Sequence, residues 1–157
     1  MWAEHGFGHY GNGLIQLIDP DAYRDNLWGW LLLEEDDMTR LPIALSAFGD
    51  VFYYRKLSDE GDEDVAVLDP HRSASDVLVW SIEDFFNDWC CDDETISGFL
   101  DAPLLAQAVL AKGPLGHDEI YYFVPALRLG GLRSAAQVDK GDARVHLDLL
   151  LQLALDG

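Results

Sequence analysis

Short blocks of apolar residues, separated by turn residues, fill the first half of the chain and predict β-strands. The blocks are Leu14–Ile18, Ile43–Phe48, Val51–Lys56, Val65–Leu68 and Val77–Trp80, with a further one at Tyr121–Val124. Gly49-Asp50 stands between two of them and is typical of a two-residue hairpin turn, which follows the twist of paired strands. Consecutive strands joined by turns indicate an antiparallel sheet.

Helix signals follow, mainly in the second half. Asp19-Pro20, Ser81 with Asp84, and Asp101 are typical N-termini, and Gly113-Pro114 is a typical end. The expected buried faces are Tyr23, Leu27, Trp30 and Leu31; Ile82, Phe85, Phe86 and Trp89; Leu104, Leu105, Ala108 and Val109; and, in a last helix over about 142–155, Val145, Leu149, Leu150 and Leu153. The pattern predicts an α+β fold: an antiparallel sheet of short strands in the first half, packed by helices mainly from the second half.

The length of 157 residues and the apolar content of 49% fit one domain, residues 1–157, with a single core. The longest apolar run, Trp28–Leu33, is far shorter than the roughly 18 residues of a membrane span. No basic segment followed by an apolar stretch opens the chain, and Cys90 and Cys91 are adjacent, so they predict no disulfide framework. We therefore expect a reducing, cytoplasmic location.

The net charge of the chain limits the kinds of partner that it can bind. Ten basic residues against 29 acidic ones give a net charge of −19. Such a chain lacks the basic stripe that replaces phosphate counterions, and an anionic membrane surface repels it. A basic protein partner is attracted and steered toward it. The alternative is that the acidity serves solubility alone.

Candidate catalytic motifs are weak. Gly6 to Gly11 spells G-x-G-x-x-G, but a dinucleotide site needs a strand before it and a helix after it, whereas here a strand follows. We interpret it as a glycine-rich turn. The cysteine spacing excludes a C-x-x-C zinc site, no EF-hand loop is present, and no G-x-S-x-G elbow occurs. The sequence thus predicts no enzyme, no cofactor and no metal.

Four sequence blocks resemble a known family. They are Gly6–Ile15 followed by Asp19–Tyr23; Ala47–Tyr54; Gly113–Leu115 with Asp118–Leu127 and Leu129–Gly131; and His146-Leu147 with Leu150–Leu153. Together they resemble the GAD-related immunity proteins of bacterial type VI secretion systems. The third block is the most specific of the four, and the resemblance spans nearly the whole chain.

This resemblance implies a function in the cytoplasm. Family members are encoded beside secreted toxins, often DNases, and bind them so that the producing cell survives. No catalytic residues are carried over, and the shared glycines and aromatics are expected to be structural. Members carry more helical sequence ahead of the glycine-rich block, which implies either a shortened member or a missing N-terminal helical segment here.

Acidic segments are the predicted contacts with such a toxin. A nuclease attracts a polyanion, so its active face is usually basic, and an acidic inhibitor gains from meeting it. The predicted partner-binding residues are Glu34, Glu35, Asp36 and Asp37; Asp59, Glu60, Asp62, Glu63 and Asp64; and Asp92, Asp93 and Glu94. Each segment could instead be ordinary solvated surface.

Two other classes stay open from the residues alone. A regulatory module could hold a small ligand at the glycine-rich start and the tryptophan-lined surfaces. An enzyme would need a pocket with converging carboxylates, because no nucleophile motif is recognisable.

Overall fold

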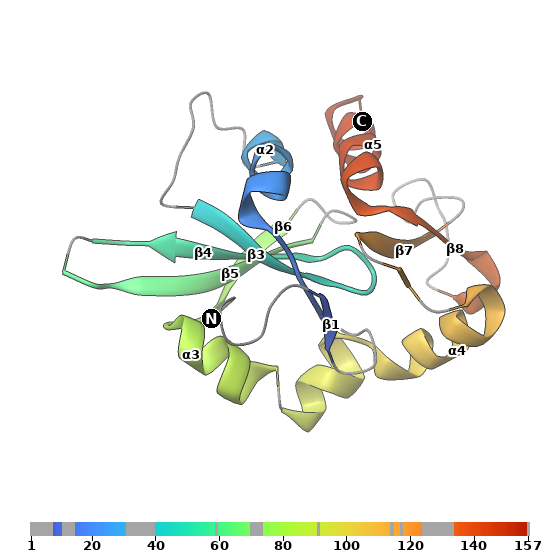
Figure 1. The fold of residues 1–157 in the computed structure, drawn as a ribbon, viewed down its shortest axis with the longest axis horizontal. Coiled ribbons are helices and arrows are strands. Elements are labelled where there is room, and N and C mark those ends of the chain that lie inside the picture. The colour runs from blue at the N-terminus through green and yellow to red at the C-terminus, as the bar shows by residue number, and fades with distance from the viewer. Residues whose placement is uncertain are drawn as a thin grey trace.

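A computed structural model of the chain describes residues 8–10, 15–30, 40–58, 60–69, 74–90, 92–113, 115–116, 118–123 and 134–156. Its main sheet is an antiparallel meander in which each strand pairs with the next along the chain (Figure 1). The strands are β1 (Gly8–Tyr10), β2 (Ile15–Leu17), β3 (Arg40–Ser46), β4 (Val51–Lys56), β5 (Glu63–Asp69) and β6 (Ala74–Val79). The described part therefore confirms an antiparallel sheet in the first half.

Helices cover both faces of this sheet. They are α2 (Pro20–Trp30), α3 (Ile82–Asp84), the π-helical turns η2 (Phe85–Trp89) and η3 (Thr95–Phe99), α4 (Ala102–Lys112), the 3-10 turn η5 (Ala135–Gln137) and α5 (Ala143–Asp156). Figure 1 shows α2 and α5 on one side of β3–β5, and α3 and α4 on the other. The α+β class is thus confirmed, and of the helices that the structure describes only α2 lies in the first half.

Each face of the sheet has its own core. Phe52 packs against Phe85 and Trp89 on the α3–α4 side, with ring centroids 5.1 and 5.3 Å away. Tyr53, the next residue, points to the α2–α5 side and joins the cluster that contains Leu147. Because consecutive strand residues point to opposite faces and both faces are covered, the central strands read as continuous apolar runs.

A second, two-stranded sheet pairs β7 (Glu119–Phe123) with β8 (Val138–Asp142). The amide of Tyr121 donates to the carbonyl of Ala47 at 2.8 Å, so β7 is fastened to the turn between β3 and β4. The sequence did not predict β8, whose residues Val-Asp-Lys-Gly-Asp have low strand propensity. Pairing with β7, a tertiary effect, makes this segment a strand.

The hairpin turn is longer than predicted. Strand β3 ends at Ser46, so Ala47–Asp50 connects the strands in place of Gly49-Asp50 alone. The Ser46 hydroxyl accepts from the amides of Phe48 at 3.3 Å and Asp50 at 3.0 Å, and donates to the Asp50 carboxylate at 2.8 Å. A buried serine closes the wider turn, which a two-residue rule cannot anticipate.

The predicted N-termini of three helices are confirmed. Helix α2 begins at Pro20, and Asp19 Oδ1 accepts from the amide of Asp21. Ser81 and Asp101 cap α3 and α4 by accepting from the amides of Asp84 and Leu104. The π-helical continuation of α3 was not predicted.

The inward face of α5 was predicted wrongly in part. Val145 and Leu149 are about half exposed, whereas Ala143, Leu147 and Leu150 are buried. Both sets are spaced four or three residues apart, so periodicity alone fits either. Packing against α2 selects the second set. Trp30, Leu31, Phe86 and Leu153 carry predictions that lie outside the side chains the structure describes.

Candidate partner-binding surface

The loop between β4 and β5 is shaped by its own hydrogen bonds. The amide of Leu57 donates to the carbonyl of Asp62 at 2.8 Å, and the Ser58 hydroxyl donates to the Asp62 carboxylate at 2.9 Å. Ser58 also accepts from the amide of Glu60 at 3.2 Å, and Gly61 supplies a positive φ of 99°. The loop therefore presents Glu60 and Asp62, both exposed, in a fixed arrangement.

The acidic segment predicted over 59–64 is not all loop. Glu63 and Asp64 are the first residues of β5, and Asp59 lies outside the described residues. Glu63 is half-buried, and its Oε2 accepts from the amide of Ile82 at 3.0 Å, which ties β5 to the start of α3. The predicted solvated loop thus ends at Asp62.

Asp64 has a structural role. Its carboxylate is completely buried and accepts from Arg55 Nε at 2.7 Å and Nη2 at 2.5 Å. The two residues stand opposite each other on β4 and β5. The hydrogen bonds to Asp64 raise the pKa of Arg55 above its usual range. The expectation of a solvated Asp64 is therefore wrong, because a cross-strand guanidinium encloses it.

A cleft of about 390 Å³, the Trp80 cleft, opens beside this loop. Its lining residues are Leu57, Gly61, Asp62, Glu63 and Trp80. Trp80 is 70% exposed, and Leu57 is 48% exposed. The apolar pattern predicted Trp80 as the last residue of a strand but did not predict its exposure to solvent. Trp80 lies between β6 and the capping residue Ser81, and a residue between two elements need not face either core.

The other two predicted segments have different outcomes. Asp92, Asp93 and Glu94 are exposed, and Asp92 Oδ2 accepts from the Thr95 amide at 3.0 Å. In Figure 1 they precede η3 at the bottom of the view, away from the free end of the β4–β5 hairpin. The structure therefore does not bring them to the Trp80 cleft. Glu34–Asp37 lies outside the described residues.

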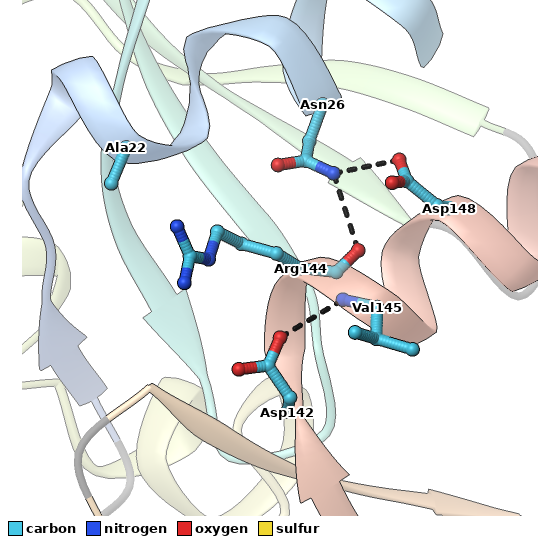
Figure 2. A pocket seen from close by; sticks show the side chains of 6 residues that line it. All are labelled: Ala22, Asn26, Asp142, Arg144, Val145 and Asp148. Carbon is cyan, nitrogen blue, oxygen red and sulfur yellow. Dashed lines mark hydrogen bonds between the residues drawn. The ribbon is translucent and has the colours of Figure 1, made fainter.

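A second cleft, of about 430 Å³, lies between α2 and α5 (Figure 2). Its lining residues are Ala22, Asn26, Asp142, Arg144, Val145 and Asp148. Asn26 is buried, and its Nδ2 donates to the carbonyl of Arg144 at 3.3 Å and to Asp148 Oδ1 at 2.8 Å. In Figure 2 the Arg144 guanidinium extends toward α2, on the side to which the amide oxygen of Asn26 points.

This α2–α5 cleft carries charges of both signs. Asp142 lines the cleft, and its Oδ1 accepts from the amide of Val145 at 3.0 Å. Within the described ranges Arg144 has no ion pair. The cleft can thus offer guanidinium donors and carboxylate acceptors to one bound group.

Two further observations concern metal binding and membrane spans. In the part of the chain that the structure describes, no group of three His, Cys, Asp or Glu side chains is placed to hold a metal ion. Among those same residues, no helix is long and apolar enough to cross a membrane.

The fold has a solved counterpart. The crystal structure of Atu4351 from Agrobacterium tumefaciens matches with a TM-score of 0.67 over 96% of this chain and 72% of that chain. At 14% identity this likeness shows the fold alone. No curated protein matches the chain.

The fold and the site geometry define this protein as an α+β domain with an acidic surface that bears clefts. Residues 1–61 match the GAD-like domain family, and residues 81–154 match the family described as T6SS immunity protein Tdi1, C-terminal. The two matches follow each other along the chain and leave residues 62–80, with β5 and β6, between them. The chain belongs to the GAD-related immunity proteins of type VI secretion systems.

Proposed function

We propose that this protein is the cytoplasmic antidote to a DNase toxin delivered by a type VI secretion system, and that it neutralises the toxin by direct contact without a catalytic step. The observation that carries the proposal is the pair of family matches, which together cover residues 1–61 and 81–154. An immunity function supported by the family requires a toxin as partner.

The charge supports a nuclease as that toxin. A net charge of −19 favours a partner with a basic face, and a DNA-cleaving enzyme presents such a face to its polyanionic substrate. The predicted contact set has five exposed members among the described residues: Glu60 and Asp62 on the hairpin loop, and Asp92, Asp93 and Glu94 before η3.

Survival on co-expression tests the proposal. Cells that express the toxin encoded beside this gene should lose viability and DNA integrity, and co-expression of this chain should restore both. A toxin variant without cleavage activity is the control for expression burden. Continued DNA loss with both proteins present at comparable levels would refute the antidote function.

The α2–α5 cleft favours a second candidate, a small-ligand regulatory module. Arg144 could bind a carboxylate while Asp142 and Asp148 bind an ammonium group, which is the pattern of a free amino acid. Thermal unfolding with free amino acids tests it, because a ligand that binds the native state raises the midpoint. The Arg144→Ala variant should lose any such rise, and no rise for any amino acid would dismiss this candidate.

A further inference from the structure

Trp80 is an unusual residue to leave in water. Its side chain is 70% exposed at the end of the edge strand β6, next to Leu57 from the β4–β5 loop. Large aromatic side chains dominate the energetics of protein interfaces because their burial removes much apolar area from water. The pair gives the lining of the cleft its large apolar side chains.

The lining of this cleft also carries two acidic residues, Asp62 and Glu63. Asp62 accepts through Oδ2 from the Ser58 hydroxyl, and Glu63 accepts through Oε2 from the Ile82 amide. Within the part of the chain that the structure describes, no hydrogen bond reaches the second oxygen of either carboxylate, which leaves it for a bound group. Because the first bonds are internal, both carboxylates are already oriented before a partner arrives, which lowers the entropy cost of binding.

The guanidinium on the same hairpin does not serve this cleft. Arg55 is held by both oxygens of the buried Asp64. An incoming cation therefore does not have to displace Arg55 in order to reach Asp62 and Glu63.

We propose that the Trp80 cleft takes an arginine side chain of the toxin, which stacks on the indole and donates to Asp62 and Glu63. This inference rests on the proposed antidote function. A planar guanidinium suits the site better than an ammonium, because it stacks on aromatic faces and donates to two carboxylates at once. Its aliphatic stem can lie along Leu57.

Three variants of the full chain test the site by titration calorimetry against the cognate toxin. Trp80→Ala should weaken binding roughly 30-fold, the size of an interface hot spot, with the salt dependence unchanged. Asp62→Asn with Glu63→Gln keeps the internal hydrogen bonds but removes two charges, and should weaken binding and flatten its salt dependence. Leu110→Ala is the matched control, since Leu110 is apolar and 89% exposed on α4; it should bind like the wild type.

The outcomes separate the two proposals. If the wild type binds and both the Trp80→Ala and the double variant bind within twofold of it, the arginine site is wrong and the antidote function stands. If the wild type itself fails to bind the active toxin, both fall. Thermal unfolding checks the fold of each variant, and Trp80→Phe, which keeps an aromatic face, should lose less affinity than Trp80→Ala.

Discussion

The ion pair of Arg55 and Asp64 lies in the hairpin that carries the Trp80 cleft. It joins β4 to β5 through two hydrogen bonds, with the carboxylate completely buried and the guanidinium side chain 27% exposed. A buried charge without its partner is strongly unfavourable, so each residue depends on the other. The pair fixes the strand ends from which the loop begins.

Removal of this carboxylate should destabilise the fold. We expect Asp64→Ala to lower the free energy of unfolding by about 3 kcal/mol, because it leaves Arg55 partly buried without its acceptor. Urea unfolding measures the change. Glu60→Ala, which alters an exposed acidic residue of the same hairpin, should stay within about 0.5 kcal/mol of the wild type. Equal losses for the two variants would contradict the assigned role of the pair.

His146 makes the stability depend on pH. Its ring stacks on Tyr122 with centroids 3.7 Å apart, and burial lowers the pKa of His146, although Asp142 and Asp139 oppose the shift. A lowered pKa means that the unfolded chain binds the proton more readily than the folded one. The stability that neutral His146 contributes is therefore complete above about pH 6.5 and is lost as the pH falls from there through the folded-state pKa.

Replacement of this histidine should remove that component. Between pH 7.5 and pH 5.5 the melting temperature of His146→Phe should fall less, or rise more, than that of the wild type. The acidic residues titrate alike in both proteins, so the difference between the two pH responses isolates the imidazole. Parallel responses would show that His146 is not desolvated in the fold.

At the scale of elements, the parts that local chemistry decides were predictable. Asp19, Ser81 and Asp101 predicted helix N-termini correctly. A side-chain oxygen just before an amphipathic helix accepts from amides of the first turn that have no partner within the helix. Elements that depend on distant contacts were not. β8 exists through its pairing with β7, and the inward face of α5 depends on α2.

The β3–β4 turn and β7 form one tightly packed unit. Gly49 has a φ of 92°, and a Cβ there would lie 2.9 Å from Ile120 Cδ1. Gly61 has a similar φ of 99°, but open space surrounds the position of its Cβ. Alanine would therefore meet similar backbone strain at both positions, but only at position 49 would its Cβ also collide with Ile120.

Alanine at these two glycines should separate strain from packing. Gly61→Ala should cost about 1 kcal/mol, the penalty of a left-handed conformation for a residue with a Cβ. Gly49→Ala should cost at least about 1 kcal/mol more, because Ile120 must shift in a fully packed core. Urea unfolding compares them, and equal costs would show that Ile120 yields freely.

At the scale of the whole molecule, net charge indicated the class of partner but not its place of contact. The Trp80 cleft combines the end of β6 with the β4–β5 loop, so no local pattern could reveal it. Conversely, Asp64 looked like part of an acidic loop and proved to be buried, because Arg55 stands opposite it. Acidic residues of one sequence run can therefore be either surface or core.

Charge reversal at equal net charge tests where the toxin is steered. Glu60→Lys with Asp62→Lys changes the net charge by the same amount as Asp93→Lys with Glu94→Lys. If the hairpin faces the toxin, the first pair should slow association more and flatten its salt dependence more. Stopped-flow association rates at several salt concentrations measure this, and identical slowing by the two pairs would mean that only the total charge matters.

The most direct measurement of the central claim is a titration of the purified toxin's DNA cleavage with this protein. An antidote that binds tightly should lower the residual cleavage linearly and abolish it near one molecule of this protein per toxin. Undiminished cleavage at a tenfold excess of the protein would contradict the account.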